Sequence, residues 1–322
     1  MARFGTKTVA AIIAAVGLFG CRSELNRNAE RATRTTVRVL SPAPGELALP
    51  LKQGSVRFAV IGDAGRGDQA QYDTARQMSA WRERYPFEFV IMLGDNIYPP
   101  HTPDDYRRKF EEPYAPLLNA GVTFHAAIGN HDDDGQVNYG RFNMGGKRYY
   151  TFRKSETRLA GLAGAGVRFF VLDSRSFDPA QRAWLDSELA ASGTAWKICY
   201  MHHPLYTSGR YRSGARALRV AIEPLLVARD VDVVFSGHEH FYERLQPQHG
   251  ISYFISGSGG ALRLRDIRPS TLTAAGYDLD THFMLIEVSG DELYFQAIAR
   301  DGKTVDAGVI GRQPANAEAP IR

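Results

Sequence analysis

The residues with the clearest chemical potential lie in the segment GDNIYPP, at Gly94–Pro100. This segment follows the apolar run FEFVIML, residues 87–93, which is typical of a strand buried on both faces. A carboxylate at the end of a buried strand costs free energy unless it meets a cation or lies in a site. Asp95, Asn96 and Tyr98 offer an acid, an amide and a phenol, which together indicate a site for a hard metal ion.

Four other predicted strands end in side chains that can bind metals. They are Asp63 in GDAG, Asn130 in GNHD, His202 in MHHP, and the pair His238 and His240 in GHEH. Each of these taken alone is explained equally well as a turn residue or an exposed polar residue. The carboxyl ends of parallel strands meet at one edge of a sheet, so we expect all five ends to converge on Asp95.

Histidine spacing limits which imidazoles can share this site. His238 and His240 lie two residues apart, so in extended backbone both side chains point to the same face. His202 and His203 are adjacent, and we therefore expect only one of them to face the site.

The predicted elements alternate between strands and helices before a run of strands closes the chain. Helices are predicted at 69–84, 104–118 (broken near Pro113 and Pro116), 179–191 and 216–229. Strands are predicted at 56–62, 87–93, 122–128, 167–172, 196–201, 231–235, 251–256, 282–288 and 292–297. This order favours two sheets packed together with helices outside.

In order along the chain, the five motifs resemble the motif blocks of the metallophosphoesterases, the calcineurin-like phosphoesterase superfamily. The tyrosine of GDNIY resembles the purple acid phosphatase-like branch, which includes the tartrate-resistant acid phosphatases. The resemblance covers residues 56–288 and implies an α/β fold. The expected architecture is a four-layer α/β/β/α sandwich of two mixed β-sheets with flanking helices.

The resemblance also implies two metal ions and assigns their ligands. It gives Asp63, Tyr98 and His240 to the first ion and makes Asp95 the carboxylate shared by both. It gives Asn130, His202 and His238 to the second ion. It also implies that His131 and Asn130 are the catalytic residues, with His131 facing the substrate.

A phenol with a pKa near 10 needs a strongly charged ion to hold it deprotonated, which favours Fe(III) at Tyr98. The other ion would be divalent Fe, Zn or Mn. The expected reaction is hydrolysis of phosphate monoesters by a metal-bound hydroxide, with His131 assisting the leaving alkoxide. The expected substrate is a small-molecule phosphate ester.

Several neighbouring residues are weaker candidates for contacts with ligands or substrate. Asp132 could orient His131, and His203 could line the pocket wall. Arg210, Tyr211 and Arg212 stand in the loop 206–214, where relatives often carry a substrate-facing histidine. Glu243 and Arg244 are expected to pair with each other and support the His240 loop.

Two other functions use the same ligand set. One is a phosphodiesterase or nucleotidase with two divalent ions such as manganese, in which Tyr98 stays neutral. The other is a non-catalytic metal-binding lipoprotein, which the complete set of ligand positions disfavours.

The N-terminus predicts export. Residues 1–20 have a basic start and an apolar segment at 9–19, which is too short to span a bilayer and is typical of a signal peptide. The tetrapeptide LFGC resembles a bacterial lipoprotein box, in which Cys21 would carry the lipid. Phe19 departs from that pattern, so secretion without an anchor is the alternative. The expected location is the periplasm or cell surface, with the membrane contacted only through Cys21.

The rest of the chain is expected to consist of a flexible tether at 21–54, a catalytic domain at 55–300 and a partly disordered tail at 301–322. A formal charge of +4, part of it in the leader, and the lack of basic runs with interleaved aromatics argue against a nucleic-acid partner. The second cysteine, Cys199, lies in an apolar run and is expected to be a core residue.

Overall fold

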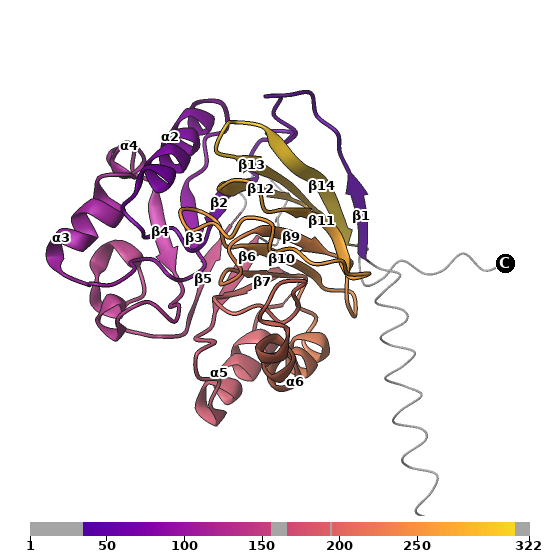
Figure 1. The fold of residues 1–322 in the computed structure, drawn as a ribbon. Coiled ribbons are helices and arrows are strands. Elements are labelled where there is room, and N and C mark those ends of the chain that lie inside the picture. The colour runs from indigo at the N-terminus through magenta and orange to yellow at the C-terminus, as the bar shows by residue number, and fades with distance from the viewer. Residues whose placement is uncertain (1–34, 156–165, 194, 313–322) are drawn as a thin grey trace, which may run out of the picture.

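Two seven-stranded mixed β-sheets form the centre of the protein (Figure 1). A computed structural model describes residues 35–155, 166–193 and 195–312. Helices cover the outer face of each sheet, so the predicted four-layer α/β/β/α sandwich is confirmed.

The first sheet places three parallel strands at one side, and these strands carry the acidic motifs. Strands β2, β3 and β4 pair in parallel, whereas the remaining pairs are antiparallel. In spatial order the sheet contains β1 (Thr35–Val39), β14 (Thr304–Arg312), β13 (Glu292–Ala299), β12 (His282–Ser289), β2 (Val56–Ile61), β3 (Phe89–Met92) and β4 (Thr123–Ala126).

The second sheet carries the histidine motifs. Four of its strands, β10, β8, β7 and β6, pair in parallel. In spatial order the sheet contains β11 (Thr273–Tyr277), β9 (Tyr242–Leu245), β10 (Ser252–Ser256), β8 (Val233–Ser236), β7 (Trp196–Met201), β6 (Val167–Val171) and β5 (Tyr150–Lys154). The expectation that all five motif strands share one sheet edge is therefore wrong, because they are divided between two sheets.

The helices begin and end close to their predicted bounds. Asp68 and Asp178 cap the two helices that start at Gln69 and Pro179, each by accepting a hydrogen bond from a backbone N–H of the first turn. The predicted helix at 104–118 is interrupted, as the two prolines indicated. The elements are α2 (Gln69–Arg84), α3 (Pro103–Tyr106), a π-helix (Arg107–Glu111), α4 (Ala115–Asn119), 3₁₀ turns (Asp134–Asn138 and Gly140–Phe142), α5 (Pro179–Ala190) and α6 (Arg212–Ala228).

An aromatic core joins the two sheets. The ring of Phe58 on β2 packs edge-on against Phe169 of β6 and Phe235 of β8, with centroid distances of 5.3 and 6.5 Å. A separate apolar cluster, which includes Cys199 as predicted, lies under helices α5 and α6. Both sheets are thus held in fixed positions, and so are the loops at the ends of their strands.

The predicted domain boundaries at 54 and 300 are wrong, because ordered strands lie outside them. Thr35–Val39 pairs with Thr304–Arg312 over five residues, and the latter strand also pairs with β13. The segment before Val56 has little hydrophobic periodicity of its own, so its strand depends on pairing with an existing sheet edge. Residues 1–34 and 313–322, including the predicted signal peptide and Cys21, lie outside the described residues.

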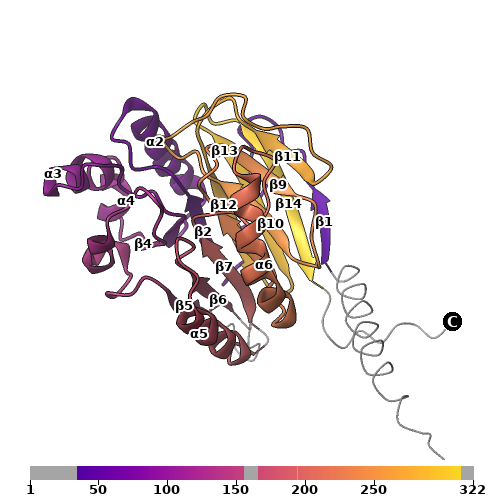
Figure 2. The same cartoon turned by 60° about the horizontal axis from the view of Figure 1, so that its bottom comes forward.

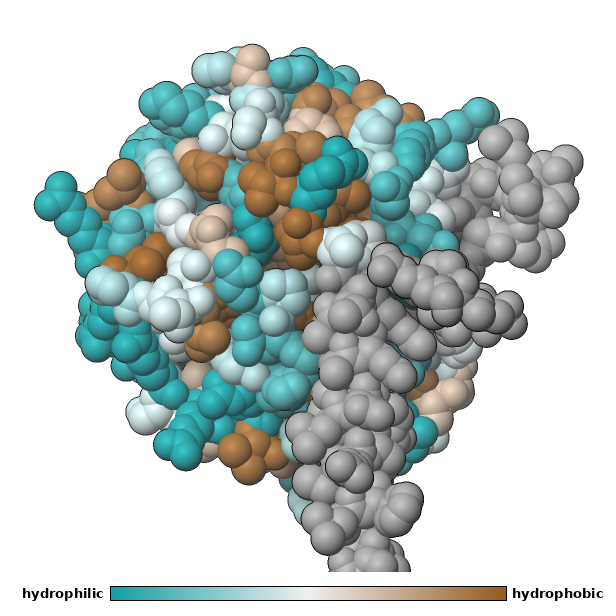
Figure 3. Space-filling view, turned by 90° about the vertical axis from the view of Figure 1, so that its right-hand side faces the viewer, coloured by the Kyte–Doolittle hydropathy of each residue, from teal (hydrophilic) through white to brown (hydrophobic). Residues whose placement is uncertain are grey.

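The surface seen in Figure 3, on the side of β1, mixes hydrophilic and hydrophobic residues, with several hydrophobic ones gathered in its upper centre. Among the residues that the structure describes, no helix combines the length and the apolar character needed to cross a membrane.

A buried ion pair links the C-terminal strand to the second sheet. Arg244 Nε on β9 donates to Asp306 Oδ2 on β14 over 2.7 Å, and both side chains are almost fully buried. Tyr242 Oη donates to the same carboxylate oxygen. The predicted pairing of Arg244 with Glu243 is wrong, because the Glu243 carboxylate accepts from the Ser208 N–H and from Thr273.

Replacing Asp306→Ala should lower the free energy of unfolding by about 3–5 kcal/mol, because it leaves the Arg244 guanidinium buried without its partner. The measurement is urea unfolding followed by circular dichroism. As a control, Asp301→Ala on the exposed preceding turn should change the free energy by no more than about 0.5 kcal/mol. Equal effects of the two substitutions would show that the Arg244–Asp306 pair does not stabilise the sandwich.

Candidate metal centre

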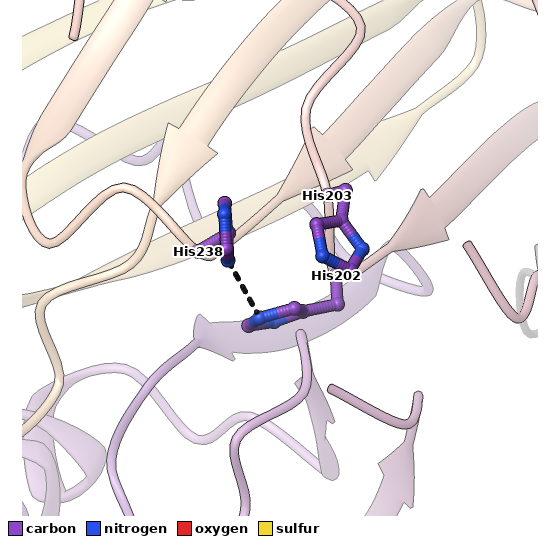
Figure 4. Close-up of side chains that lie close together, drawn as sticks. All are labelled: His202, His203 and His238. Carbon is purple, nitrogen blue, oxygen red and sulfur yellow. Dashed lines mark hydrogen bonds between the residues drawn. The ribbon is translucent and has the colours of Figure 1, made fainter. Parts of the chain in front are cut away.

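Two groups of side chains with metal-binding atoms lie where the carboxyl ends of parallel strands from the two sheets meet. The first group is Asp63, Asp95 and His240, and the second is His202, His203 and His238 (Figure 4). Within each group the ligand atoms lie within 4.8 Å of one another.

The first group combines two buried carboxylates with an imidazole, and the phenol of Tyr98 lies beside them. Asp63 follows β2 and Asp95 follows the neighbouring β3, and both side chains are at most 1% exposed. His240 Nε2 lies 3.3 Å from Asp63 Oδ1, and Tyr98 Oη lies 3.2 Å from the same nitrogen. The four side chains predicted around the first ion are therefore together.

The three imidazoles of the second group lie next to the side-chain amide of Asn130. His202 Nδ1 lies 3.0 Å from the Leu93 carbonyl oxygen, an arrangement that keeps the proton on Nδ1 and leaves the Nε2 lone pair free. That Nε2 lies 2.9 Å from Asn130 Oδ1 and 3.2 Å from His238 Nδ1. The three side chains predicted around the second ion also converge.

Asp95 lies between the two groups. Its Oδ1 is 3.4 Å from His202 Nε2, and its ligand atom also belongs to the first group. The backbone N–H of His131 donates to Asp95 Oδ1 over 2.9 Å, which holds the carboxylate in place. This position is the one that a carboxylate shared by two ions requires.

Three residues of the centre have left-handed backbone conformations. The φ angles are 53° at Asp63, 51° at Asp95 and 69° at His238. Such conformations cost about 1–3 kcal/mol for residues with a side chain, and they occur where the surrounding structure imposes them at functional sites. They turn these three side chains out of the strand direction at three of the five strand ends.

Burial sets the protonation states of the centre. It lowers the pKa of His238 to about 2 and of His240 to about 3, so these imidazoles are neutral at pH 7. Burial and the Asp95 charge raise the pKa of Asp63 well above its usual value, and Asp63 Oδ1 accepts no hydrogen bond. Neutral imidazoles and under-partnered carboxylate oxygens are a donor set that fits hard or intermediate metal cations.

The two catalytic candidates lie at the outer side of the centre, where Asn130 and His131 are exposed. The His131 ring packs on Tyr98 with a centroid distance of 4.9 Å. The expectation that Asp132 orients His131 is wrong, because the Asp132 carboxylate accepts from the N–H groups of Ile97 and Gly129 and from the side chains of Asn96 and Gln136. Asp132 thus ties the loop after β3 to the loop after β4.

His203 also lies at the centre, although its neighbour His202 already faces it. Its ring centroid lies 4.4 Å from that of His238, and its Nδ1 lies 2.9 Å from Ser174 Oγ. The expectation that only one of the two histidines faces the site is therefore wrong, because β7 ends at Met201 and the backbone beyond it is no longer extended.

The three residues of the loop 206–214 have different surroundings. Tyr211 packs on the His238 ring with a centroid distance of 4.3 Å and therefore borders the site. Arg210 is paired with Asp266 over 2.9 Å, and the Arg212 guanidinium donates to the Ser208 carbonyl oxygen. Only Tyr211 of the three contacts the centre.

Sequence reasoning missed a buried pair beside the histidines. Glu239 is fully buried and accepts hydrogen bonds from Thr207 Oγ1 and from the Tyr211 N–H. Arg263 lies 3.4 Å from Glu239 Oε2 and stacks over the Tyr211 ring at 5.0 Å. Glu239 lies between the two histidines of GHEH, and this position could have indicated a role beside the centre. Arg263 lies outside all five motifs, so its position could not have been predicted from them.

The backbone at Gly129 lies directly against the Asp95 carboxylate, and a substitution of Gly129 tests whether metal binding requires this close approach. A Cβ there would overlap the side chain and backbone nitrogen of Asp95, so Gly129→Ala should weaken metal binding by about 10–100-fold. Bound metal per chain, measured by mass spectrometry against free metal concentration, provides the readout. Gly140→Ala is the matched control, since no heavy atom lies within 4 Å of its added Cβ. Unchanged metal binding in the Gly129 variant would contradict this geometry.

Comparisons with known proteins agree with the geometry. The family model of the calcineurin-like phosphoesterases matches residues 56–242. Tartrate-resistant acid phosphatase type 5 of Rattus norvegicus is 24% identical over 308 residues, covering 81% of this chain and 91% of that protein. Purple acid phosphatase 7 of Arabidopsis thaliana is 26% identical over 238 residues, covering 65% of this chain and 71% of that protein.

Two solved structures share the fold. Purple acid phosphatase PPD1 from yellow lupin (Lupinus luteus) seeds superposes with a TM-score of 0.63 at 18% identity, covering 88% of this chain and 58% of that one. GAP50, the anchor in the inner membrane complex of Plasmodium, superposes with a TM-score of 0.72 at 18% identity, covering 81% and 90%. The family match extends over more than half of the chain and includes all five motifs of the centre. The chain is therefore a metal-dependent phosphoric ester hydrolase and belongs to the calcineurin-like phosphoesterase family.

Proposed function

We propose that the protein hydrolyses phosphate monoesters at a dinuclear centre with Fe(III) in one position and divalent Fe, Zn or Mn in the other. Asp63, Tyr98 and His240 would hold Fe(III), and Asn130, His202 and His238 would hold the divalent ion, with Asp95 shared. The observation that carries this proposal is the phenol of Tyr98, 3.2 Å from His240 Nε2 in the carboxylate-bearing group.

Two ions in these positions would polarise the phosphoryl oxygens and acidify a water molecule for attack on phosphorus. The protein itself supplies orientation. Asp95 is held by the His131 N–H, and the His202 ring is held by the Leu93 carbonyl oxygen. The exposed His131 ring is free to donate a hydrogen bond to the leaving oxygen of an ester in the centre.

A second candidate is a phosphodiesterase or nucleotidase with two divalent ions. One observation favours it: burial and the carboxylates of Asp63 and Asp95 raise the pKa of Tyr98. The phenol therefore stays neutral unless a strongly charged ion is bound. Metal analysis combined with the visible spectrum separates the two candidates.

Export and a lipid anchor at Cys21 belong to the same proposal. They rest on the apolar segment at 9–19 and the LFGC tetrapeptide. The intact mass of the mature protein, with or without acyl chains on Cys21, is the deciding measurement.

Replacing Tyr98→Phe should abolish the purple charge-transfer colour of the iron-loaded protein, because the phenylalanine ring offers no oxygen to iron. Visible absorption spectra of the two proteins at equal iron content provide the measurement. A colour that persists in the variant would refute a tyrosinate ligand.

Replacing His131→Gln should lower kcat for a phosphate monoester by about 10²–10⁴-fold, since the leaving oxygen loses its proton donor. Metal content should not change, because the contact of residue 131 with Asp95 is through the backbone. Steady-state assays of a monoester and a diester on metal-analysed protein are the test. Faster turnover of the diester would favour the phosphodiesterase. If protein with a full complement of metal turned over neither ester, both candidate functions would be refuted.

A further inference from the structure

A buried lysine lies next to the loop that carries Tyr98. Lys109 belongs to the π-helix Arg107–Glu111, which directly follows α3, and its side chain is 6% exposed. Figure 2 shows α3 and α4 at the side of the first sheet that contains β4. A lysine is seldom buried unless its charge is paired, so we expect its ammonium group to have specific partners.

The ammonium group of Lys109 contacts three consecutive carbonyl oxygens and one carboxylate. Nζ donates to the Tyr98 carbonyl oxygen over 2.6 Å and lies 3.4 Å from the carbonyl oxygens of Pro99 and Pro100. It also lies 2.9 Å from Oδ1 of Asp105, a side chain that is 1% exposed. An ammonium group has three N–H donors. Two short contacts and one shared by the prolines use all three, so Lys109 is fully committed to this segment.

The backbone of Tyr98 is held from both sides. The two prolines that follow it carry no N–H group, so this part of the loop has no backbone donors with which to bind a neighbouring segment. Lys109 supplies the missing donors. On the other side, the Tyr98 N–H donates to the Gly65 carbonyl oxygen over 2.9 Å. Gly65 lies two residues after Asp63, so this bond joins the loops that carry two of the ligands proposed for the first ion.

The phenol ring of Tyr98 has looser contacts than its backbone. It packs on the rings of His131 and His240, with centroid distances of 4.9 and 6.4 Å, and the Arg66 guanidinium lies 5.7 Å from its centre. His131 and Arg66 are exposed, and exposed side chains change rotamer readily. The position of the phenol oxygen therefore depends on the fixed backbone of Tyr98.

Resting on the function proposed above, we propose that Lys109 is a positioning residue that holds the Tyr98 phenol at the first ion. It acts through the carbonyl oxygens of the loop and not through the metal. The hydrogen bonds and ion pairs of Lys109 within the described residues involve no other proposed ligand. The ligands of the second ion should therefore be unaffected by its loss.

The test is Lys109→Met, which keeps a long unbranched side chain and removes all three donors. The absorbance per bound iron in the charge-transfer band should fall. Affinity for Fe(III), measured by competition with a chelator, should fall by about 10–100-fold, as for other residues that orient ligands. The content of divalent metal should not change. Lys303→Met is the matched control, because Lys303 pairs with Asp301 on an exposed turn and is itself 75% exposed.

The same substitution in Tyr98→Phe protein separates positioning of the phenol from a general structural role. Lys109→Met should then cause no further loss of iron affinity, because the phenol through which Lys109 acts is absent. Equal losses in both backgrounds, or wild-type absorbance per iron in Lys109→Met, would overturn this inference. The proposed tyrosinate would still stand if Tyr98→Phe alone removed the colour. Iron-loaded wild-type protein without the colour would refute both.

Lys109→Met also leaves the Asp105 carboxylate without its buried partner, which is destabilising. If circular dichroism shows that this variant does not fold, Lys109→Gln decides. Its amide has two N–H donors in place of three and no charge, so Fe(III) affinity and absorbance per iron should both fall below those of the wild type. Wild-type values in Lys109→Gln would overturn the inference. Failure of both variants to fold would also overturn it, since Lys109 would then be required for folding.

Discussion

A buried carboxylate requires positive charge or hydrogen bonds close by, and this protein places two, Asp63 and Asp95, in one small group of side chains. In the part of the chain that the structure describes, their oxygens accept from the backbone N–H groups of His238 and His131, residues of the same centre. The imidazoles around them are neutral because they are buried too. The charge of the carboxylates is thus left for bound cations to balance. The loops that carry the carboxylates are held to their neighbours by hydrogen bonds, such as those of Asp132 between the loops after β3 and β4.

The two-sheet architecture meets this requirement by bringing carboxyl ends of parallel strands from both sheets to one place. Acidic and amide ligands come from the first sheet, and the histidines come from the second. The centre therefore depends on the packing of one sheet against the other, through Phe58 and the buried pair of Arg244 and Asp306. Elements far from the chemistry thereby help to hold the ligands at their mutual distances.

Around the centre, most charged side chains are committed to partners within the protein. Arg210 pairs with Asp266, Arg263 lies against Glu239, and Arg175 pairs with Asp173 and Asp134. Tyr211 packs on the His238 ring with a centroid distance of 4.3 Å. The wall beside the second group combines apolar and aromatic side chains with Ser174 and with Arg175, whose charge is paired within the protein.

The order and content of the five motifs were sufficient to predict the fold class and the convergence of the seven ligand candidates. The convergence was predicted for one sheet edge, whereas it arises because the carboxyl ends of parallel strands from two sheets meet. The residue types then limit the chemistry. The left-handed turns at Asp63, Asp95 and His238, the inward position of His203 and the strands at 35–39 and 304–312 were decided by the tertiary structure. Their conformations depend on contacts with residues distant in sequence, and such contacts cannot be predicted from the local hydrophobic periodicity of a segment.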